Sequence, residues 1–147
     1  MEFKDEFNII KGEKIELKIL YRDEGDNEEI PYYYYGIFLD GIKKSIGKIS
    51  IRIGHNYHSY FNGNIGFEID EEYQGNHYAY EAAKLVIQVA KAHNMDYVII
   101  TCNKSNVASS KTIEKLGAKL IEEVDPPQDY LFYFEGIETH KIYRLDI

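Results

Sequence analysis

The sequence has very few residues of the kind that form covalent or metal cross-links. Among 147 residues it has one cysteine, Cys102, and no tryptophan. A lone cysteine excludes an internal disulfide framework and supplies no metal site by itself. His55 and His58 are spaced as H-x-x-H without an evident third ligand, so we predict a solvated loop there and no metal. The cysteine count favours a reducing, cytoplasmic setting.

Long apolar runs and clusters of positive charge are also missing. No run reaches the roughly 18 apolar residues of a membrane-spanning helix, and the first residues, MEFKDEFNIIKGEK, lack the apolar core of a signal peptide. The 17 Lys and Arg against 25 Asp and Glu give a net charge of −8. Nucleic-acid binding requires a basic face, which we do not find. We therefore expect neither membrane nor nucleic acid as a partner. The acidity either suits a cationic substrate or serves solubility.

What the sequence does have is a set of alternating patterns typical of β-strands. Ile15, Leu17 and Ile19 share one face of such a pattern, and Asp40–Gly41 is typical of a hairpin turn. The segment His55–Gly63 is predicted to be a polar turn. Strands are predicted at Lys14–Tyr21, Tyr32–Leu39, Ser45–Ile53, Ile65–Asp70, Tyr97–Cys102 and Ala118–Val124, followed by a closing hairpin of Tyr130–Glu135 and Lys141–Ile147.

Two stretches change to a helical period. Between Tyr78 and Lys91, small and apolar residues recur at helical spacing, and Asn94 suits a left-handed terminator. A second helix is predicted from a Ser105 cap to Leu116, with Gly117 just past its end. The order of four strands, helix, strand, helix and further strands indicates one α+β domain, residues 1–147, with a mixed sheet.

The turn Gln74–Ala79 is the first candidate for a binding site. It joins the fourth predicted strand to the first helix, where the first backbone N–H groups of the helix have no internal partner and the helix dipole adds positive charge. Such a junction binds anions, and Gly75 allows close backbone approach. From the residues alone, an ordinary tight connection is the alternative.

Two segments resemble the GNAT superfamily of N-acetyltransferases. Gln74 and Ala79 match the ends of its acetyl-CoA motif Gln/Arg-x-x-Gly-x-Gly/Ala, while His77 takes the place of the central glycine. The preceding I-G-F-E-I-D-E-E-Y resembles the ribosomal-protein N-terminal acetyltransferase-like branch. Asn103–Ala118 is similar to the segment N-x-x-S-x-x-x-x-E-K-L-G-F, with Ala118 in place of Phe.

This resemblance implies a fold and a cosubstrate. The fold is a mixed, mostly antiparallel sheet of about seven strands flanked by helices, splayed between the fourth and fifth strands, with the usual two helices between the first strands reduced to about Arg22–Pro31. The implied activity is transfer of an acetyl group from acetyl-CoA by direct attack of a primary amine on the thioester. The implied cofactor-binding residues are Ile69, Gln74, Gly75, Asn76, His77, Tyr78, Ala79, Asn106 and Ser109.

The resemblance also implies candidate residues for the general acid and the general base. The family's usual tyrosine acid is replaced by Ile113, so Ser109 or its neighbour Ser110 is expected near the sulfur. Glu68 is our candidate base, acting through water; the alternative is an exposed strand carboxylate. Other candidate bases are Tyr130, Tyr133 and His140.

Several alternatives concern the acceptor and the activity itself. The acceptor is a protein N-terminus, a small amine such as a polyamine or amino sugar, or an antibiotic amine. A non-catalytic acyl-CoA-binding module is the alternative to an enzyme, and the exposed closing strands would allow a homodimer.

Overall fold

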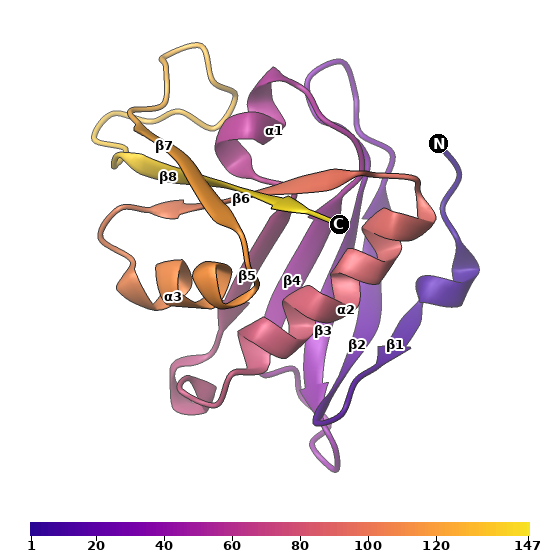
Figure 1. Cartoon of the computed structure of the whole chain (residues 1–147). Coiled ribbons are helices and arrows are strands. Elements are labelled where there is room, and N and C mark those ends of the chain that lie inside the picture. The colour runs from indigo at the N-terminus through magenta and orange to yellow at the C-terminus, as the bar shows by residue number, and fades with distance from the viewer.

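One twisted sheet organises the chain, and the computed structural model describes all residues from 1 to 147 (Figure 1). Its eight strands lie in the order β1-β2-β3-β4-β5-β6-β8-β7. The strands are β1 (Ile9–Lys11), β2 (Ile15–Asp23), β3 (Tyr32–Leu39), β4 (Gly47–Arg52), β5 (Ile65–Ile69), β6 (Tyr97–Asn103), β7 (Lys119–Val124) and β8 (His140–Asp146). The helices are α1 (Tyr57–Asn62), α2 (Tyr78–Ala92) and α3 (Val107–Lys115), with 3₁₀ turns at Asp5–Phe7 and Glu71–Tyr73.

The sheet is antiparallel except where β5 meets β6. These two parallel strands share a single pair, Ile65 with Ile100, and then separate. The predicted splay is therefore present. Its closed end is held by the buried Asn64, whose side chain accepts from Ile99 N at 2.8 Å and donates to the carbonyls of Arg52 and Gly54 at 3.0 and 2.8 Å.

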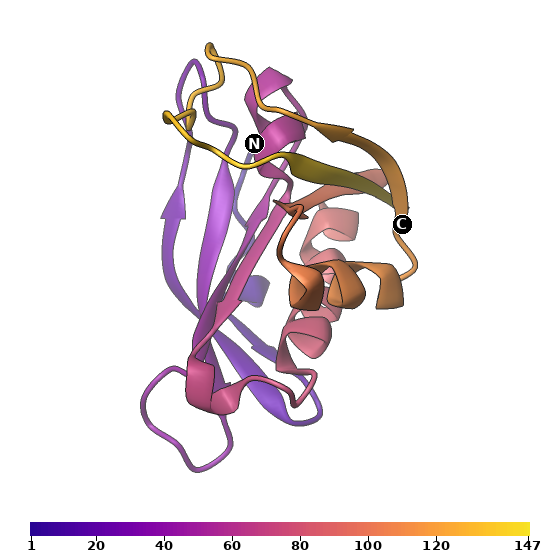
Figure 2. The same cartoon turned by 90° about the vertical axis from the view of Figure 1, so that its left-hand side faces the viewer.

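The two faces of the sheet are covered unequally. Helix α2 packs on β2, β4 and β5, and α3 lies on the same side against β6. Figure 2 shows both helices on one side and no helix over the outer face of β1–β4. Helix α1 contacts β6 and β8, and together with the loop 125–139 it lies on the other side of these strands from α3. None of the helices is long and apolar enough to cross a membrane.

Alternation along β3 places its tyrosines on opposite faces. Tyr33 and Tyr35 are fully buried toward α2, where Tyr33 OH lies 2.8 Å from His93 Nε2. Tyr32 and Tyr34 are half-buried on the other face, beside Tyr21. The strand predicted at Tyr32–Leu39 is confirmed, and its tyrosines contribute both to the core and to the uncovered face.

The predicted polar turn at His55–Gly63 is wrong in its centre, because this segment contains α1. The Asn56 side chain accepts from Ser59 N at 2.8 Å and Ser59 Oγ accepts from Asn56 N at 2.9 Å, which forms a capping box. Phe61 is buried against Tyr130, so packing stabilises a helix too short to form alone.

The predicted closing hairpin is also wrong in its first half. Tyr130–Glu135 forms turns rather than a strand, because β8 inserts between β6 and β7 and satisfies both edges. Only Lys141–Ile147 matches a strand. The short β1 was not predicted and makes the sheet eight-stranded, and Asn106, not Ser105, caps α3 by accepting from Ser109 N at 3.1 Å.

Candidate functional site

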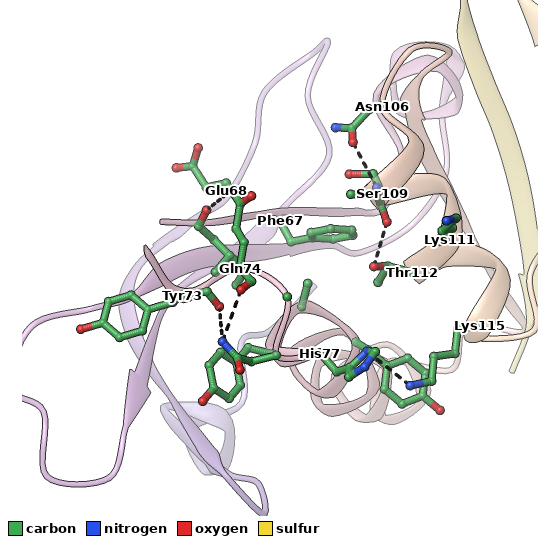
Figure 3. Close-up of a pocket in the computed structure, with 17 residues that line it drawn as sticks. Phe67, Glu68, Tyr73, Gln74, His77, Asn106, Ser109, Lys111, Thr112 and Lys115 are labelled. Atoms are coloured by element: carbon green, nitrogen blue, oxygen red, sulfur yellow. Dashed lines mark hydrogen bonds between the residues drawn. The ribbon is translucent and has the colours of Figure 1, made fainter. Parts of the chain in front are cut away.

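A cavity of about 510 Å³ lies between the free end of β5, the start of α2 and one side of α3 (Figure 3). It forms where β5 and β6 separate, so the splay gives it access to unpaired backbone of β5. All the residues expected to bind the cofactor line it, and so do the first catalytic candidates, Glu68 and Ser109. Its lining is Phe67, Glu68, Ile69, Tyr73, Gln74, Gly75, Asn76, His77, Tyr78, Ala79, Tyr80, Asn106, Ala108, Ser109, Lys111, Thr112 and Lys115.

The backbone between β5 and α2 makes one wall of this cavity. Gly75 has a φ of 84°, with no atom near where its Cβ would be, and His77 precedes α2 with a φ of 63°. No side chain caps α2, so the N–H groups of its first turn are free for a ligand. The left-handed backbone at His77 explains why the family pattern has glycine there, since a side chain costs about 1 kcal/mol in that region.

The His77 ring does not close this wall. Its Nδ1 lies 3.5 Å from Lys115 Nζ on α3, and Figure 3 shows the two side chains pointing toward each other. Lys115 Nζ also lies 4.5 Å from the centre of the Tyr80 ring. Lys111 and Lys115 thus place two cationic side chains near the free N–H groups, in a chain that is acidic as a whole. This combination of fixed dipoles and lysines suits phosphate groups.

Two predicted binding residues hold the loop rather than point into the cavity. Gln74 Nε2 donates to the Ile69 carbonyl at 2.9 Å. Asn76 Nδ2 donates to the Tyr73 carbonyl at 3.1 Å. Their side chains fix the backbone that would contact a ligand, which is a reason for amide side chains at these positions.

The serines on α3 face different surroundings. Ser109 lines the cavity, and its hydroxyl has no hydrogen-bond partner in the protein. Ser110 is buried on the other side of the helix, 3.5 Å from Cys102 Sγ, 3.3 Å from Tyr143 OH and 3.4 Å from Lys141 Nζ. Only Ser109 is therefore positioned to reach a molecule in the cavity.

The candidate bases are distributed unevenly. Glu68 is exposed, and Figure 3 shows its carboxylate pointing away from the Phe67 ring, toward the face that α2 leaves uncovered. Tyr130, Tyr133 and His140 do not line the cavity. Burial raises the pKa of Tyr130 to about 12, which disfavours the deprotonated form that a base requires.

Other expectations about side chains concern Ile113 and the histidines. Ile113 is fully buried in the core, so no hydroxyl replaces the usual tyrosine at that position. His55 stacks on Tyr97, and His58 Nδ1 accepts from Leu131 N at 3.0 Å. No group of three or more possible ligands could hold a metal ion.

Several lining residues were missed, although the sequence carried a signal for those on α3. Ala108, Lys111, Thr112 and Lys115 follow one another at the three- and four-residue spacing of one helix face. Extending that face from Ala108, the residue before Ser109, would have found the other three. Phe67 and Tyr80 had no such signal, because their exposure depends on how far the strands separate.

Comparison with known proteins places this geometry in a family. The family profile described as Acetyltransferase (GNAT) domain matches residues 11–119. A Vibrio cholerae protein assigned as a ribosomal-protein-serine acetyltransferase superposes with a TM-score of 0.68 at 18% identity, over 95% of this chain and 97% of that chain. No curated protein matches the chain.

Two further solved structures share the fold. RimL, a ribosomal L7/L12 alpha-N-protein acetyltransferase in its apo form, has a TM-score of 0.67 at 15% identity, over 95% of this chain and 94% of that chain. MccE, a Microcin C7 self immunity acetyltransferase in complex with acetyl-CoA and AMP, has a TM-score of 0.60 at 20% identity. That match covers 79% of this chain and 61% of the MccE chain, so this chain spans about three-fifths of its length.

Proposed function

Since this chain belongs to the acetyltransferase (GNAT) domain family and is an acetyl-CoA-dependent N-acetyltransferase, we propose that its acceptor is the α-amino group at a polypeptide N-terminus. The observation that carries the proposal is the uncovered face of β2–β5, where the short connection between β2 and β3 contains no helix. An extended chain can lie across such a surface. RimL, which shares the fold, is itself an alpha-N-protein acetyltransferase.

The cavity fits acetyl-CoA by shape and by charge. The N–H groups of the first turn of α2, with Lys111 and Lys115, would hold the phosphates. The apolar Phe67 and the unpaired edge of β5 would hold the pantetheine arm by packing and backbone hydrogen bonds. The cosubstrate supplies an activated acyl group: its C–S bond breaks as the N–C bond to the amine forms.

Three groups of this chain would serve that transfer. Glu68, on the uncovered face, takes the proton of the amine through a water molecule. A backbone N–H on β5 donates to the carbonyl oxygen where negative charge develops. The unpartnered Ser109 hydroxyl donates a hydrogen bond to the departing sulfur, which leaves as a thiolate, while the proton lost by the amine passes through the water to Glu68. A thiolate leaves more readily than an alkoxide, so a serine is sufficient where other members have tyrosine.

The remaining expectations form part of the same proposal. The domain is the single unit 1–147, acting in the cytoplasm, without nucleic acid or membrane as a partner. The single cysteine and the lack of a basic cluster support this.

The test is release of free thiol from acetyl-CoA with a panel of amines. We expect turnover with peptides that have a free α-amino group and none with the same peptides blocked at that group. Turnover of polyamines or amino sugars but not of peptides would make this a small-molecule enzyme. Binding of CoA without thiol release across the whole panel would instead leave a non-catalytic acyl-CoA-binding module.

A further inference from the structure

The uncovered face has its own polar centre at the splay. Gly66 follows Ile65, the one residue of β5 that pairs with β6, and it lies on the face away from α2. As a glycine it places no side chain in this side of the gap. A Cβ atom built on Gly66 would lie 3.4 Å from Ser50 Oγ and 3.8 Å from Arg52 Nη1. Glu68, two residues further along β5 on this face, lines the cavity, so an amine that reaches the cavity beside Glu68 from this face would lie close to the Arg52 guanidinium.

Arg52 is held in place by neutral groups only. Its Nη1 lies 3.4 Å from Ser50 Oγ. With the Asn62 amide oriented so that its oxygen faces the guanidinium, that oxygen accepts from Nη2 at 3.1 Å and from Nε at 3.3 Å. The guanidinium also lies 5.4 Å from the centre of the Tyr32 ring. These contacts occupy three of the five N–H donors of an arginine and leave two for a ligand.

The missing carboxylate distinguishes Arg52 from the other two arginines of the chain. Arg22 pairs with Asp5 at 2.9 Å and Arg144 with Asp146 at 2.9 Å, both at the surface. Arg52 is half-buried, and burial lowers its pKa, while the charge of Glu29 acts in the opposite direction; no acidic group lies within 4.0 Å of the guanidinium. Glu28 and Glu29 line a small hollow with Arg52, but neither carboxylate reaches it. A half-buried guanidinium that no carboxylate of the chain contacts is free to pair with a carboxylate from outside the chain.

We propose that Arg52 binds a carboxylate that the acceptor carries close to its reactive amine. This rests on acetyl transfer at the proposed site and adds a selectivity that the family alone does not give. Two sources supply that chemistry: an acidic side chain in the first residues of a polypeptide, or the α-carboxylate of a free amino acid. Because the chain as a whole carries a charge of −8, the attraction must be local, and Arg52 supplies it.

The expected preference follows from the strength of a charge-assisted hydrogen bond. Such a bond contributes about 1.5–3 kcal/mol, which corresponds to roughly a tenfold to a hundredfold difference in kcat/KM. The planar guanidinium matches a carboxylate with two parallel bonds, so lysine is an incomplete replacement.

The test compares C-terminally amidated peptides that begin Ser-Asp, Ser-Asn or Ser-Lys and are otherwise identical, together with free serine. Amidation leaves the Asp side chain as the only carboxylate near the amine. In the unaltered protein we expect the Ser-Asp peptide to exceed the Ser-Asn peptide by at least about tenfold in kcat/KM, with Ser-Lys below both. If free serine were preferred over all peptides, Arg52 would still bind a carboxylate, but that group would be the α-carboxylate of a free amino acid and not an acidic side chain of a peptide.

Variants of Arg52 then assign the preference to this side chain. In R52Q we expect the ratio of the Asp to the Asn peptide to fall to about one, and in R52K to take an intermediate value. R144Q is the matched control, because it removes an arginine on β8 and should leave the ratio unchanged. Equal rates for the Asp and Asn peptides in the unaltered protein would overturn the proposal, whether or not R52Q folds. The absence of thiol release with every acceptor would contradict the proposed function instead.

Discussion

The two faces of the sheet at the splay are built in different ways. The face with α2 and α3 presents mainly backbone to the cavity: free N–H groups, a left-handed residue before α2 and an unpaired strand edge, together with Lys111 and Lys115. The opposite face offers side chains, among them Glu68, Arg52 and Tyr32. Backbone cannot be exchanged by mutation, whereas side chains can. One face therefore suits a cosubstrate common to the family, and the other suits an acceptor that differs between members.

Replacing Asn64 should have the largest effect, because its side chain holds the closed end of the gap between β5 and β6, and both faces depend on that gap. Asn64→Leu keeps the volume but leaves Ile99 N and two carbonyls without partners. We expect a loss of about 3 kcal/mol in the free energy of unfolding, measured by urea denaturation. The control is Asn27→Leu, at an exposed position with no side-chain hydrogen bond. If Asn64→Leu were as stable as that control, the splay would not depend on this amide.

Glu68 tests whether the uncovered face takes part in the chemistry. In Glu68→Gln we expect kcat to fall by roughly a hundredfold or more at neutral pH, since the base is lost, with an unchanged KM for acetyl-CoA. The deficit should shrink as the pH rises above about 8, where an α-amino group is already unprotonated. Glu71→Gln, an exposed carboxylate on the following turn, is the control. Equal kcat at every pH would remove Glu68 from the role of base.

Lys115 tests the face with α2 and α3, where we expect a change in the KM for acetyl-CoA and none in the preference among acceptors. Because it lies at the mouth of the cavity, Lys115→Gln should raise the KM for acetyl-CoA about fivefold and leave the preference among acceptors unchanged, as expected for a partly screened charge contact of about 1 kcal/mol. Lys91→Gln, at the far end of α2, is the control. His77→Gly in the same assay shows whether the ring itself contributes. A change in acceptor preference on replacing Lys115 would contradict the division between the faces.

The backbone-built face was also the one that the sequence predicted best. Gln74–Ala79 is contiguous, so the resemblance to the family motif could be recognised in one short stretch of sequence, and Asn106 and Ser109 lie on one helix turn. The side-chain face depends on register between strands: Arg52 meets Gly66 only because β4 and β5 pair as they do. The prediction of a strand at Tyr130–Glu135 was wrong for a similar reason. Strand β8 pairs with β6, which is distant in sequence, instead of forming a hairpin with this segment.

The smallest expected effect lies in the core beneath the α2 face, and it separates stability from activity. Burial lowers the pKa of His93 below its usual 6.5, beside Tyr33 OH. The unfolded chain therefore binds a proton more readily than the folded one as the pH falls below 6.5, so this histidine's contribution to stability is full above that pH and is lost below it. His93→Gln, which retains a polar side chain, should flatten the dependence of the urea midpoint on pH in that window while leaving the KM for acetyl-CoA and the acceptor preference unchanged. His140→Gln, a half-exposed histidine, is the control and should keep the slope. An unchanged slope in His93→Gln would show that the histidine titrates alike in the folded and unfolded chain.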